Sequence, residues 1–163
     1  MLIDYCNSLN LKLKYTFIKN PIYNKINYIY SIFLALKELN DDIILMHGDL
    51  YFDQITLENL MNTEESSIAI DNTLPHSKKD FKAEFCCGYV KKVATYINSE
   101  NCVAFQPLYK LNKFDWLIWA QVIKQFCNKR NTNVYVEEVL DTVLDQIKLR
   151  PLDLKDRLCM EVD

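Results

Sequence analysis

Glycine is scarce in this sequence: among 163 residues there are only two, Gly48 and Gly88. Enzymes that wrap a phosphate group in backbone N–H donors normally use glycine-rich loops, since glycine lets the backbone approach the ligand closely. Two isolated glycines give little material for such a loop. The sequence is therefore poor in the residues that a backbone phosphate site needs.

Long apolar runs and clusters of basic residues are also missing. No apolar stretch approaches the ~20 residues of a membrane span, and Met1 is not followed by the basic region and apolar core of a signal peptide. The formal charge is −3, with both signs scattered along the chain, whereas a nucleic-acid-binding surface shows a basic patch or stripe. We therefore expect a cytoplasmic protein with neither a membrane nor a nucleic acid as its partner.

The six cysteines show none of the Cys-x-x-Cys spacing that marks zinc or redox motifs. Cys86 and Cys87 are adjacent in an expected strand, so their side chains are predicted to point to opposite faces. We expect reduced, mostly buried thiols.

Apolar residues are abundant enough for one folded domain over residues 1–163, since half of the residues are hydrophobic. Segments with strand periodicity alternate with segments of helical periodicity. Strands are expected at residues 11–18, 43–48, 67–71, 83–87, 89–97, 102–109 and 158–162. This alternation predicts an α/β fold, a three-layer α/β/α arrangement around a mixed, mostly parallel, Rossmann-like sheet. Residues 11–18, the next helix and residues 43–48 are expected to form a right-handed βαβ unit.

The stretch around Asp49 carries the strongest chemical signal. The apolar run from Ile43 to Met46 predicts a buried strand, and it ends just before Gly48 and Asp49. Ligands in open α/β sheets bind beyond the carboxyl ends of strands, where a carboxylate is well placed to hold a hard cation such as Mg²⁺ against a phosphate. The alternative is structural, because Gly-Asp pairs are common in turns and Asp49 can simply cap one.

Short motifs occur before, at the end of and after this strand, in the order Asn20-Pro21, Asn27, Ser31, Asp49 and Glu161-Val162-Asp163. This order resembles the nucleotidyltransferase superfamily, whose members join an NTP to a sugar 1-phosphate or to phosphocholine. In that family, an Asn-Pro turn and a helix with Asn and Ser at its start precede a strand ending in a metal-binding Asp. A later strand carries a second acidic motif, Glu-hydrophobic-Asp. The resemblance covers roughly residues 11–163.

The resemblance implies that Asp49 and Asp163 are the catalytic carboxylates and hold one or two Mg²⁺ ions. Nucleotidyl transfer is an in-line attack on the α-phosphorus of the NTP, so the task of the protein is to position and stabilise charged groups. Glu161, two residues before Asp163, shares its face of the strand. It either assists the metal through water or forms an ion pair. The implied substrates are an NTP and a phosphorylated small-molecule acceptor.

Three further residues match polar positions of the family's substrate pocket. Asn27 and Ser31 are four residues apart, which predicts one helical face. The resemblance implies that they order the substrate, with local hydrogen bonding to the backbone as the alternative. Glu137 matches a family acid that precedes a late helix. The alternative is that it only stabilises that helix through a favourable interaction with the helix dipole. The phosphocholine branch surrounds the quaternary ammonium with aromatic rings, for which the available residues include Tyr23, Tyr28, Tyr30 and Tyr109.

One family motif is missing. Members of the family open with a Gly-x-Gly-x-Arg loop and a Pro-Lys pair that bind the triphosphate, and nothing in residues 1–19 resembles them. The resemblance therefore implies the carboxyl-terminal portion of a nucleotidyltransferase, weak or inactive alone, with the missing segment supplied by another chain. The alternatives are an inactive binding module that keeps the acceptor pocket, and an α/β interaction protein in which both acidic motifs are accidental.

Overall fold

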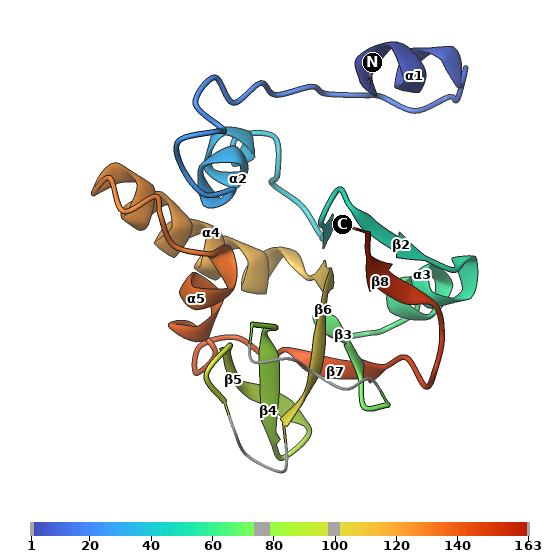
Figure 1. The fold of residues 1–163 in the computed structure, drawn as a ribbon, viewed down its shortest axis with the longest axis vertical. Helices are drawn as coiled ribbons and strands as arrows, with labels where there is room; N and C mark the ends of the chain where they lie inside the picture. Colours follow the sequence, from blue (N-terminus) through green and yellow to red (C-terminus); the bar gives the residue numbers. More distant parts are fainter. Residues whose placement is uncertain (1, 74–78, 98–101, 163) are drawn as a thin grey trace.

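The computed structural model describes residues 2–73, 79–97 and 102–162. Its elements are α1 (Leu2–Ser8), α2 (Ile29–Ala35), β1 (Ile43–Met46), β2 (Leu50–Phe52), α3 (Gln54–Met61), β3 (Ser67–Asp71), β4 (Lys82–Cys86), β5 (Tyr89–Ala94), β6 (Cys102–Leu111), α4 (Lys113–Asn128), α5 (Val136–Asp141), β7 (Arg150–Asp153) and β8 (Cys159–Glu161). Figure 1 shows α2, α4 and α5 on one side of β6, and α3 with β2 and β8 on the other. None of the described helices is long and apolar enough to cross a membrane.

The main sheet is built on β6, which is ten residues long. Five of its six strands follow the order β5-β4-β6-β3-β7, and β1 pairs separately with β6. β3 and β7 are parallel, whereas the other described pairs are antiparallel. The mixed sheet is thus confirmed, but the prediction of mostly parallel strands is wrong. β4 and β5 form a hairpin, and β6 runs against each of its three partners.

Two strands share one edge of β6 without meeting. β1 pairs with residues 108–111 and β4 with residues 102–104, while β3 occupies the opposite edge. Residues 105–107 of the shared edge therefore have no paired strand in the described chain. Because β1 and β4 both run antiparallel to β6, the carboxyl end of β1 faces the amino end of β4 across this gap.

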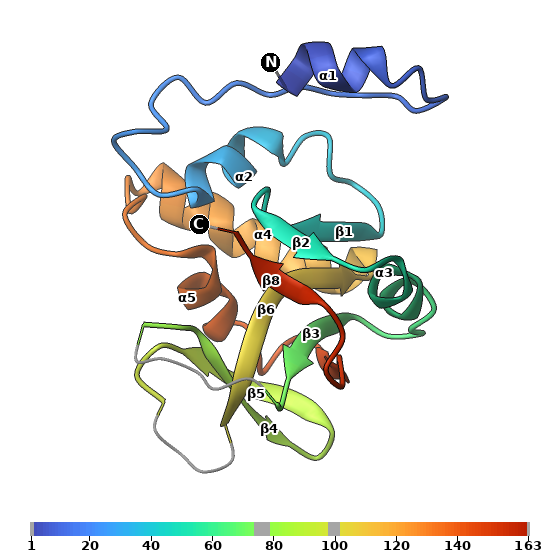
Figure 2. The same ribbon diagram turned by 45° about the vertical axis from the view of Figure 1, so that its right-hand side comes forward.

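Apolar side chains form separate cores on the two faces of the sheet. Neighbouring residues of β3 show the division: Ile68 and Ile70 pack with α2, α4 and α5, whereas Ala69 packs with Leu60 of α3. Such alternation is expected, since successive strand side chains point to opposite faces. The second core also includes Cys159 of β8, and in Figure 2 the β2–β8 pair covers part of β6. The three-layer arrangement is confirmed.

Residues 11–18, expected to be a strand, form none. Together with α1 they extend away from the rest of the chain (Figures 1 and 2), and Leu11 and Leu13 are 53% and 63% exposed. A strand needs a neighbour to complete its backbone hydrogen bonds, and none of the described strands pairs with this segment. The prediction is wrong for that reason, and the βαβ unit that depended on it does not form among the described residues.

The strand predicted at residues 158–162 is confirmed as β8, although it lies outside the main sheet. It pairs antiparallel with β2 in a separate, two-stranded sheet. Because β2 follows β1 after a short turn, this pairing brings the last part of the chain beside the carboxyl end of β1.

Candidate active site

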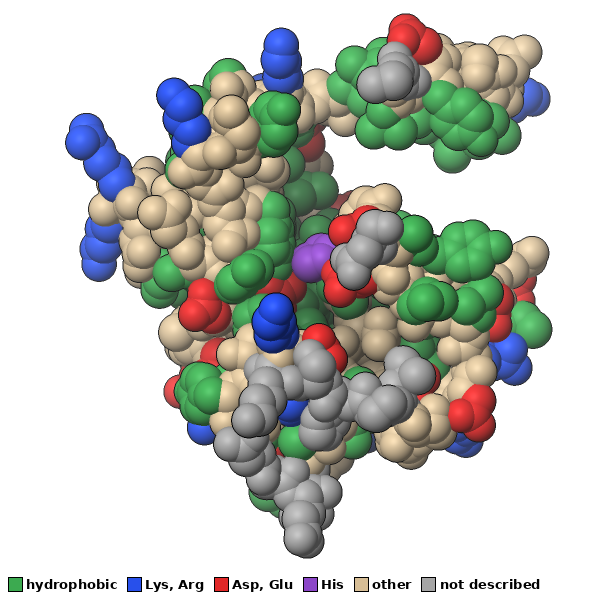
Figure 3. Space-filling view, viewed as in Figure 1, with side chains coloured by type: hydrophobic (Ala, Val, Ile, Leu, Met, Phe, Trp, Pro, Cys, Tyr) green, Lys and Arg blue, Asp and Glu red, His purple; other side chains and the backbone are tan. Residues whose placement is uncertain are grey.

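A cleft opens where β1 and β4 face each other across the unpaired part of β6. Residues that follow β1 and residues that precede β4 line it together with parts of β6, α5 and β8, and its volume is about 650 Å³. Backbone hydrogen bonds from His47 N to Pro107 O (3.2 Å) and from Phe105 N to Phe81 O (3.4 Å) fix its two sides to β6. Figure 3 shows the hollow, with a histidine and acidic side chains in its wall.

Glu137, in the first turn of α5, places a carboxylate deep in this cleft, where it is 1% exposed. Tyr28 Oη donates a hydrogen bond to its Oε2, and Tyr109 Oη donates to its Oε1 at 3.1 Å. Burial, followed by the negative charge of Glu137, raises the pKa of both Tyr28 and Tyr109. The two phenols therefore remain protonated donors, which compensates for burying the carboxylate.

His47 follows β1 directly, and its ring lies between two carboxylates. Nδ1 is 3.0 Å from Glu161 Oε1, and Nε2 is 3.6 Å from Glu137 Oε1. Burial lowers the pKa of His47, but the interactions with Glu137 and Glu161 outweigh it and raise the pKa overall. The ring of Tyr28 packs edge-on against the imidazole, with 4.8 Å between the ring centroids, and so restrains its orientation.

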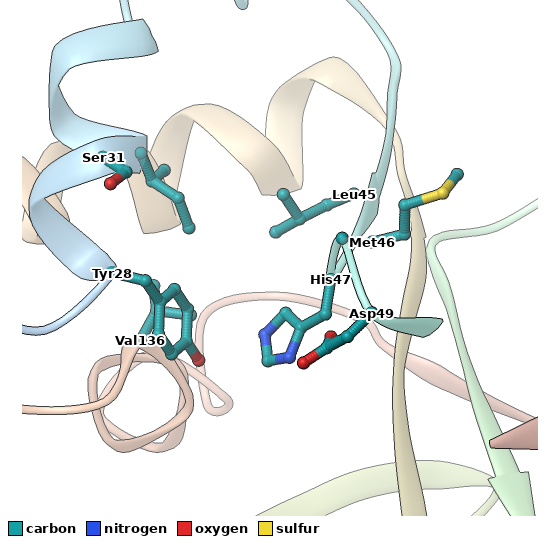
Figure 4. Close-up of a pocket in the computed structure, with 9 residues that line it drawn as sticks. Tyr28, Ser31, Leu45, Met46, His47, Asp49 and Val136 are labelled. Carbon is teal, nitrogen blue, oxygen red and sulfur yellow. The ribbon is translucent and has the colours of Figure 1, made fainter. Parts of the chain in front are cut away.

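Asp49 and Glu161 come together through the small β2–β8 sheet. Leu50 pairs with Glu161, and Val162 N donates to Asp49 O at 2.9 Å. As a result, ligand atoms of His47, Asp49 and Glu161 all lie within 4.8 Å of one another. Figure 4 shows the imidazole of His47 beside the carboxylate of Asp49. One imidazole and two carboxylates form a donor set that can coordinate a divalent cation.

Three of the predicted site residues, Asp49, Glu161 and Glu137, line the same cleft. The sequence separates Asp49 from Glu161 by most of the chain, so their approach depends on the β2–β8 pairing. Asp163 lies outside the described residues, and its role as a second catalytic carboxylate stays a prediction.

Asn27 and Ser31 lie near the cleft but do not share a helical face, because α2 begins only at Ile29. Asn27 Oδ1 accepts a hydrogen bond from Tyr28 N at 2.7 Å, which is the local bonding of the alternative interpretation. Ser31 Oγ accepts a hydrogen bond from Asn20 Nδ2 at 3.0 Å. In the described structure Ser31 therefore ties the Asn-Pro turn to α2.

Sequence reasoning does not single out His47, although it is one of only two histidines and stands two residues before Asp49. Its position directly after a strand and close to Asp49 is the signal that could have found it, because ligands in open α/β sheets bind beyond the carboxyl ends of strands. Among the tyrosines considered from the sequence, Tyr28 and Tyr109 contact Glu137. Tyr23, by contrast, is 74% exposed.

An aromatic wall borders the acidic groups of the cleft. Its rings are in sequential contact, with centroid separations of 6.3 Å for Tyr28–Tyr135, 5.5 Å for Tyr135–Phe81 and 6.4 Å for Phe81–Phe105. These residues come from separate segments of the chain, and only Tyr28 could be named from the sequence. Ring faces next to carboxylates attract organic cations.

Comparison with known proteins identifies the fold. No protein-family model and no curated protein matches the sequence. Among solved structures, the inositol-1-phosphate CTP transferase from T. maritima matches 99% of this chain, with a TM-score of 0.76 and 15% identity. CTP:phosphocholine cytidylyltransferase from Streptococcus pneumoniae also matches 99%, with a TM-score of 0.74 and 14% identity. UDP-glucose pyrophosphorylase from Acinetobacter baumanii matches 82%, with a TM-score of 0.58 and 8% identity.

These likenesses show that the chain has the fold of nucleotidyltransferases. The chain spans 65%, 69% and 50% of the lengths of the three solved chains, respectively. The identities are low, so the likeness establishes the arrangement of the elements. The chemistry of the chain depends on the residues of its own cleft.

Proposed function

We propose that this chain carries the metal-binding and acceptor-binding part of a nucleotidyltransferase. The reaction transfers a nucleotidyl group from an NTP to a phosphorylated small molecule, with release of pyrophosphate. The observation that carries the proposal is the convergence of His47, Asp49 and Glu161 on a cleft with an aromatic wall. The fold supports it, because solved nucleotidyltransferases share that fold.

A divalent cation such as Mg²⁺ fits the donor set at the mouth of the cleft. Asp49 and Glu161 supply carboxylate oxygens, and Asp163 is a third candidate from the acidic motif. When bound, such an ion neutralises charge where two phosphate groups approach each other. The role of the chain itself is to hold these carboxylates in fixed positions, which the β2–β8 hydrogen bonds do.

His47 makes this donor set different from one made of carboxylates alone. Its Nε2 is buried without a hydrogen bond and lies 3.6 Å from Glu137. Metal binding would replace the proton on Nδ1, on the side of Glu161, while the proton on Nε2 would stay directed toward the carboxylate of Glu137. Metal-binding histidines commonly have such a carboxylate behind the ring. Because imidazole suits transition metals better than Mg²⁺, we expect Mn²⁺ to bind more tightly than Mg²⁺.

The charges of the cleft favour an acceptor with a cationic group. Asp49, Glu137 and Glu161 place negative charge around it, and Tyr28 and Tyr135 expose aromatic rings beside that charge. A quaternary ammonium is attracted by both features at once, whereas a sugar ring carries no positive charge for these carboxylates to attract. Phosphocholine is therefore the proposed acceptor, in preference to a sugar 1-phosphate.

An inactive binding module is the second candidate function, and one observation favours it. The 163 residues contain neither a Gly-x-Gly-x-Arg loop nor a Pro-Lys pair. Losing a single preorganised charge-stabilising donor costs roughly 10²–10³ in rate, so residues 1–163 alone are expected to bind an acceptor without turning it over. In a transferase, a segment outside these residues, for example on a separate chain, supplies the triphosphate-binding groups.

Acceptor binding is tested by calorimetric titration of the pure chain with phosphocholine and with glucose 1-phosphate, both in Mn²⁺. Phosphocholine is expected to bind at least about tenfold more tightly, a difference of about 1.4 kcal/mol. Tyr135→Ala should weaken phosphocholine binding, whereas Tyr5→Ala, on the exposed helix α1, should not. Equal affinities for the two acceptors would remove the case for a cationic substrate.

Turnover is tested by pyrophosphate release from each NTP, with and without an added segment that carries the missing motifs. We expect no release from the chain alone. Release that requires the added segment and disappears in Asp49→Ala supports the transferase. Acceptor binding without release in any combination identifies the binding module, and robust release by the chain alone contradicts the need for another segment.

A further inference from the structure

The hairpin between β4 and β5 turns through Cys87 and Gly88. Both residues have positive φ angles, 56° and 82°, and Cys86 pairs with Tyr89 across the turn. Positive φ at both central residues is the geometry of a type I′ turn, in which Asn-Gly is the preferred sequence. Cysteine is therefore an unusual residue at position 87, where asparagine suits the backbone better.

This turn brings two thiols together. Cys86 Sγ and Cys87 Sγ are 3.4 Å apart, and both residues are exposed, whereas the other cysteines are buried or partly buried. The expectation that the two side chains point to opposite faces is wrong, because β4 ends at Cys86 and Cys87 belongs to the turn. The left-handed conformation of Cys87 replaces the strand alternation that would have separated them.

The spacing of the pair suits joint binding of one ligand better than a disulfide. Consecutive Cα atoms are about 3.8 Å apart across a trans peptide, whereas disulfides usually join Cα atoms about 4.4–6.8 Å apart. A disulfide between neighbouring residues is consequently strained and easily reduced. Cys86 and Cys87 therefore remain an accessible dithiol.

We propose that Cys86 and Cys87 form a dithiol site for thiophilic electrophiles of the trivalent-arsenic class. Soft thiolate ligands select soft metal centres over hard ones, so this site does not compete for the cation of the cleft. The two sites are also separate in space along the hairpin. Phe81 and Thr95, which line the cleft, flank the end of the β4–β5 pair opposite the turn.

The binding reaction is balanced without an oxidant or a reductant. An organic arsenous oxide, R–As=O, reacts with the two thiols so that two As–S bonds form. The oxygen of the arsenous oxide leaves as water with both thiol protons, and arsenic stays trivalent. The mutual hydrogen bond with Cys87 raises the pKa of the Cys86 thiol, while the charge of Lys91 acts in the opposite direction. Binding one arsenic to both sulfurs avoids placing two thiolates side by side.

Phenylarsine oxide tests the site, because it forms a stable cyclic product only with paired thiols. Intact-protein mass spectrometry is expected to show one phenylarsenic group per chain, with loss of one water. Cys87→Asn removes a thiol while keeping a residue that suits the turn, and Cys86→Ser removes the other thiol. Each should weaken binding at least about 100-fold, since two linked attachments become one. Cys6→Ser is the control and should bind as the parent does.

A competing dithiol such as 2,3-dimercaptopropanol should remove the arsenic, whereas glutathione at the same thiol concentration should not. Urea denaturation of each variant checks that the fold is retained. Unchanged binding by folded Cys87→Asn would overturn the proposal, as would the absence of an adduct on the parent chain. Loss of the adduct in Cys6→Ser would assign the arsenic to a different pair of thiols and also overturn it.

Discussion

Residues 11–18 and residues 43–46 both have sequence patterns typical of strands, yet only the second segment is a strand. β1 pairs with β6 over its whole length, whereas residues 11–18 pair with none of the described strands. The alternation of apolar and polar residues is in fact cleaner in the first segment. Strand propensity describes a fit to a pleated neighbour more than a preference of the isolated backbone. The difference between the segments is therefore the presence of β6.

The same difference decides which segment can carry a site. Because β1 is hydrogen-bonded to β6, it gives the residues that follow it a rigid support. His47 is held further by the hydrogen bond from its backbone N to Pro107 O. Side chains on rigid elements keep the separations that metal binding needs. The segment of residues 2–18, here called the arm, has no such support and places no side chain in the cleft.

The largest expected effect compares the same substitution in the two regions. Leu108→Ala removes a fully buried side chain of β6 opposite Met46, and should lower the free energy of unfolding by about 2–5 kcal/mol. Leu13→Ala removes a side chain that is 63% exposed in the arm, and should change it by less than about 0.5 kcal/mol. Urea denaturation measures both. A fall of more than about 1 kcal/mol in the free energy of unfolding of Leu13→Ala would show that the arm packs against the rest of the chain.

The next effect concerns the polar support behind β1. Glu137→Ala leaves the phenols of Tyr28 and Tyr109 without their acceptor, and an unsatisfied buried donor costs about 1–3 kcal/mol. We therefore expect the free energy of unfolding to fall by about 2–4 kcal/mol, a figure that already allows for partial relaxation of the cleft. Glu137→Gln keeps an acceptor and should lose less than half as much. Equal losses in the two variants would indicate that charge, and not hydrogen bonding, holds this part of the cleft.

A smaller effect is expected on metal binding at the end of β1. Asp49→Asn should weaken Mn²⁺ binding at least about tenfold, or about 1.4 kcal/mol, and Glu137→Gln should weaken it by roughly 10–100-fold by releasing the histidine ring. Asp41→Asn, on the exposed turn before β1, is the matched control. Electron paramagnetic resonance of free Mn²⁺ measures the affinities. Equal binding by Asp49→Asn and the parent would exclude this cluster as the metal site.

Much of the fold follows from local sequence, and the limits have a physical cause. The short segments that become β3, β4, β5 and β6 are each recognisable from their own residues. Only β4 and β5, which are separated by Cys87 and Gly88, also have a partner close by in the sequence. The prediction of mostly parallel strands is wrong because the parallel pair β3–β7, the only one among the described strands, and the antiparallel neighbours of β6 are set by long-range pairing. No local rule contains that information.

The candidate site divides in the same way. Asp49 could be named because it follows a strand, and Glu161 and Glu137 because they match family motifs. Nothing local indicates that the end of the chain lies beside Asp49, which depends on the pairing of β2 with β8. The ring positions of Tyr135 and Phe81 likewise depend on segments that meet only in the folded chain.

Removal of the arm by proteolysis is expected to have the smallest effect on the rest of the chain. Trypsin should cut at Lys12 and Lys14 well before any site in the described helices and strands from α2 onward, because exposed segments with few contacts open at almost no free-energy cost. The remaining fragment should keep the Mn²⁺ affinity of the intact chain, which mass spectrometry followed by resonance titration can check.

If the segment that supplies the triphosphate-binding motifs also provides the missing neighbour of residues 11–18, adding it should slow cleavage at both lysines. Protection would then show that residues 11–18 become a strand once a partner is present, as β1 does against β6. Cleavage at an unchanged rate, with pyrophosphate release restored, would show that the arm is not needed for assembly.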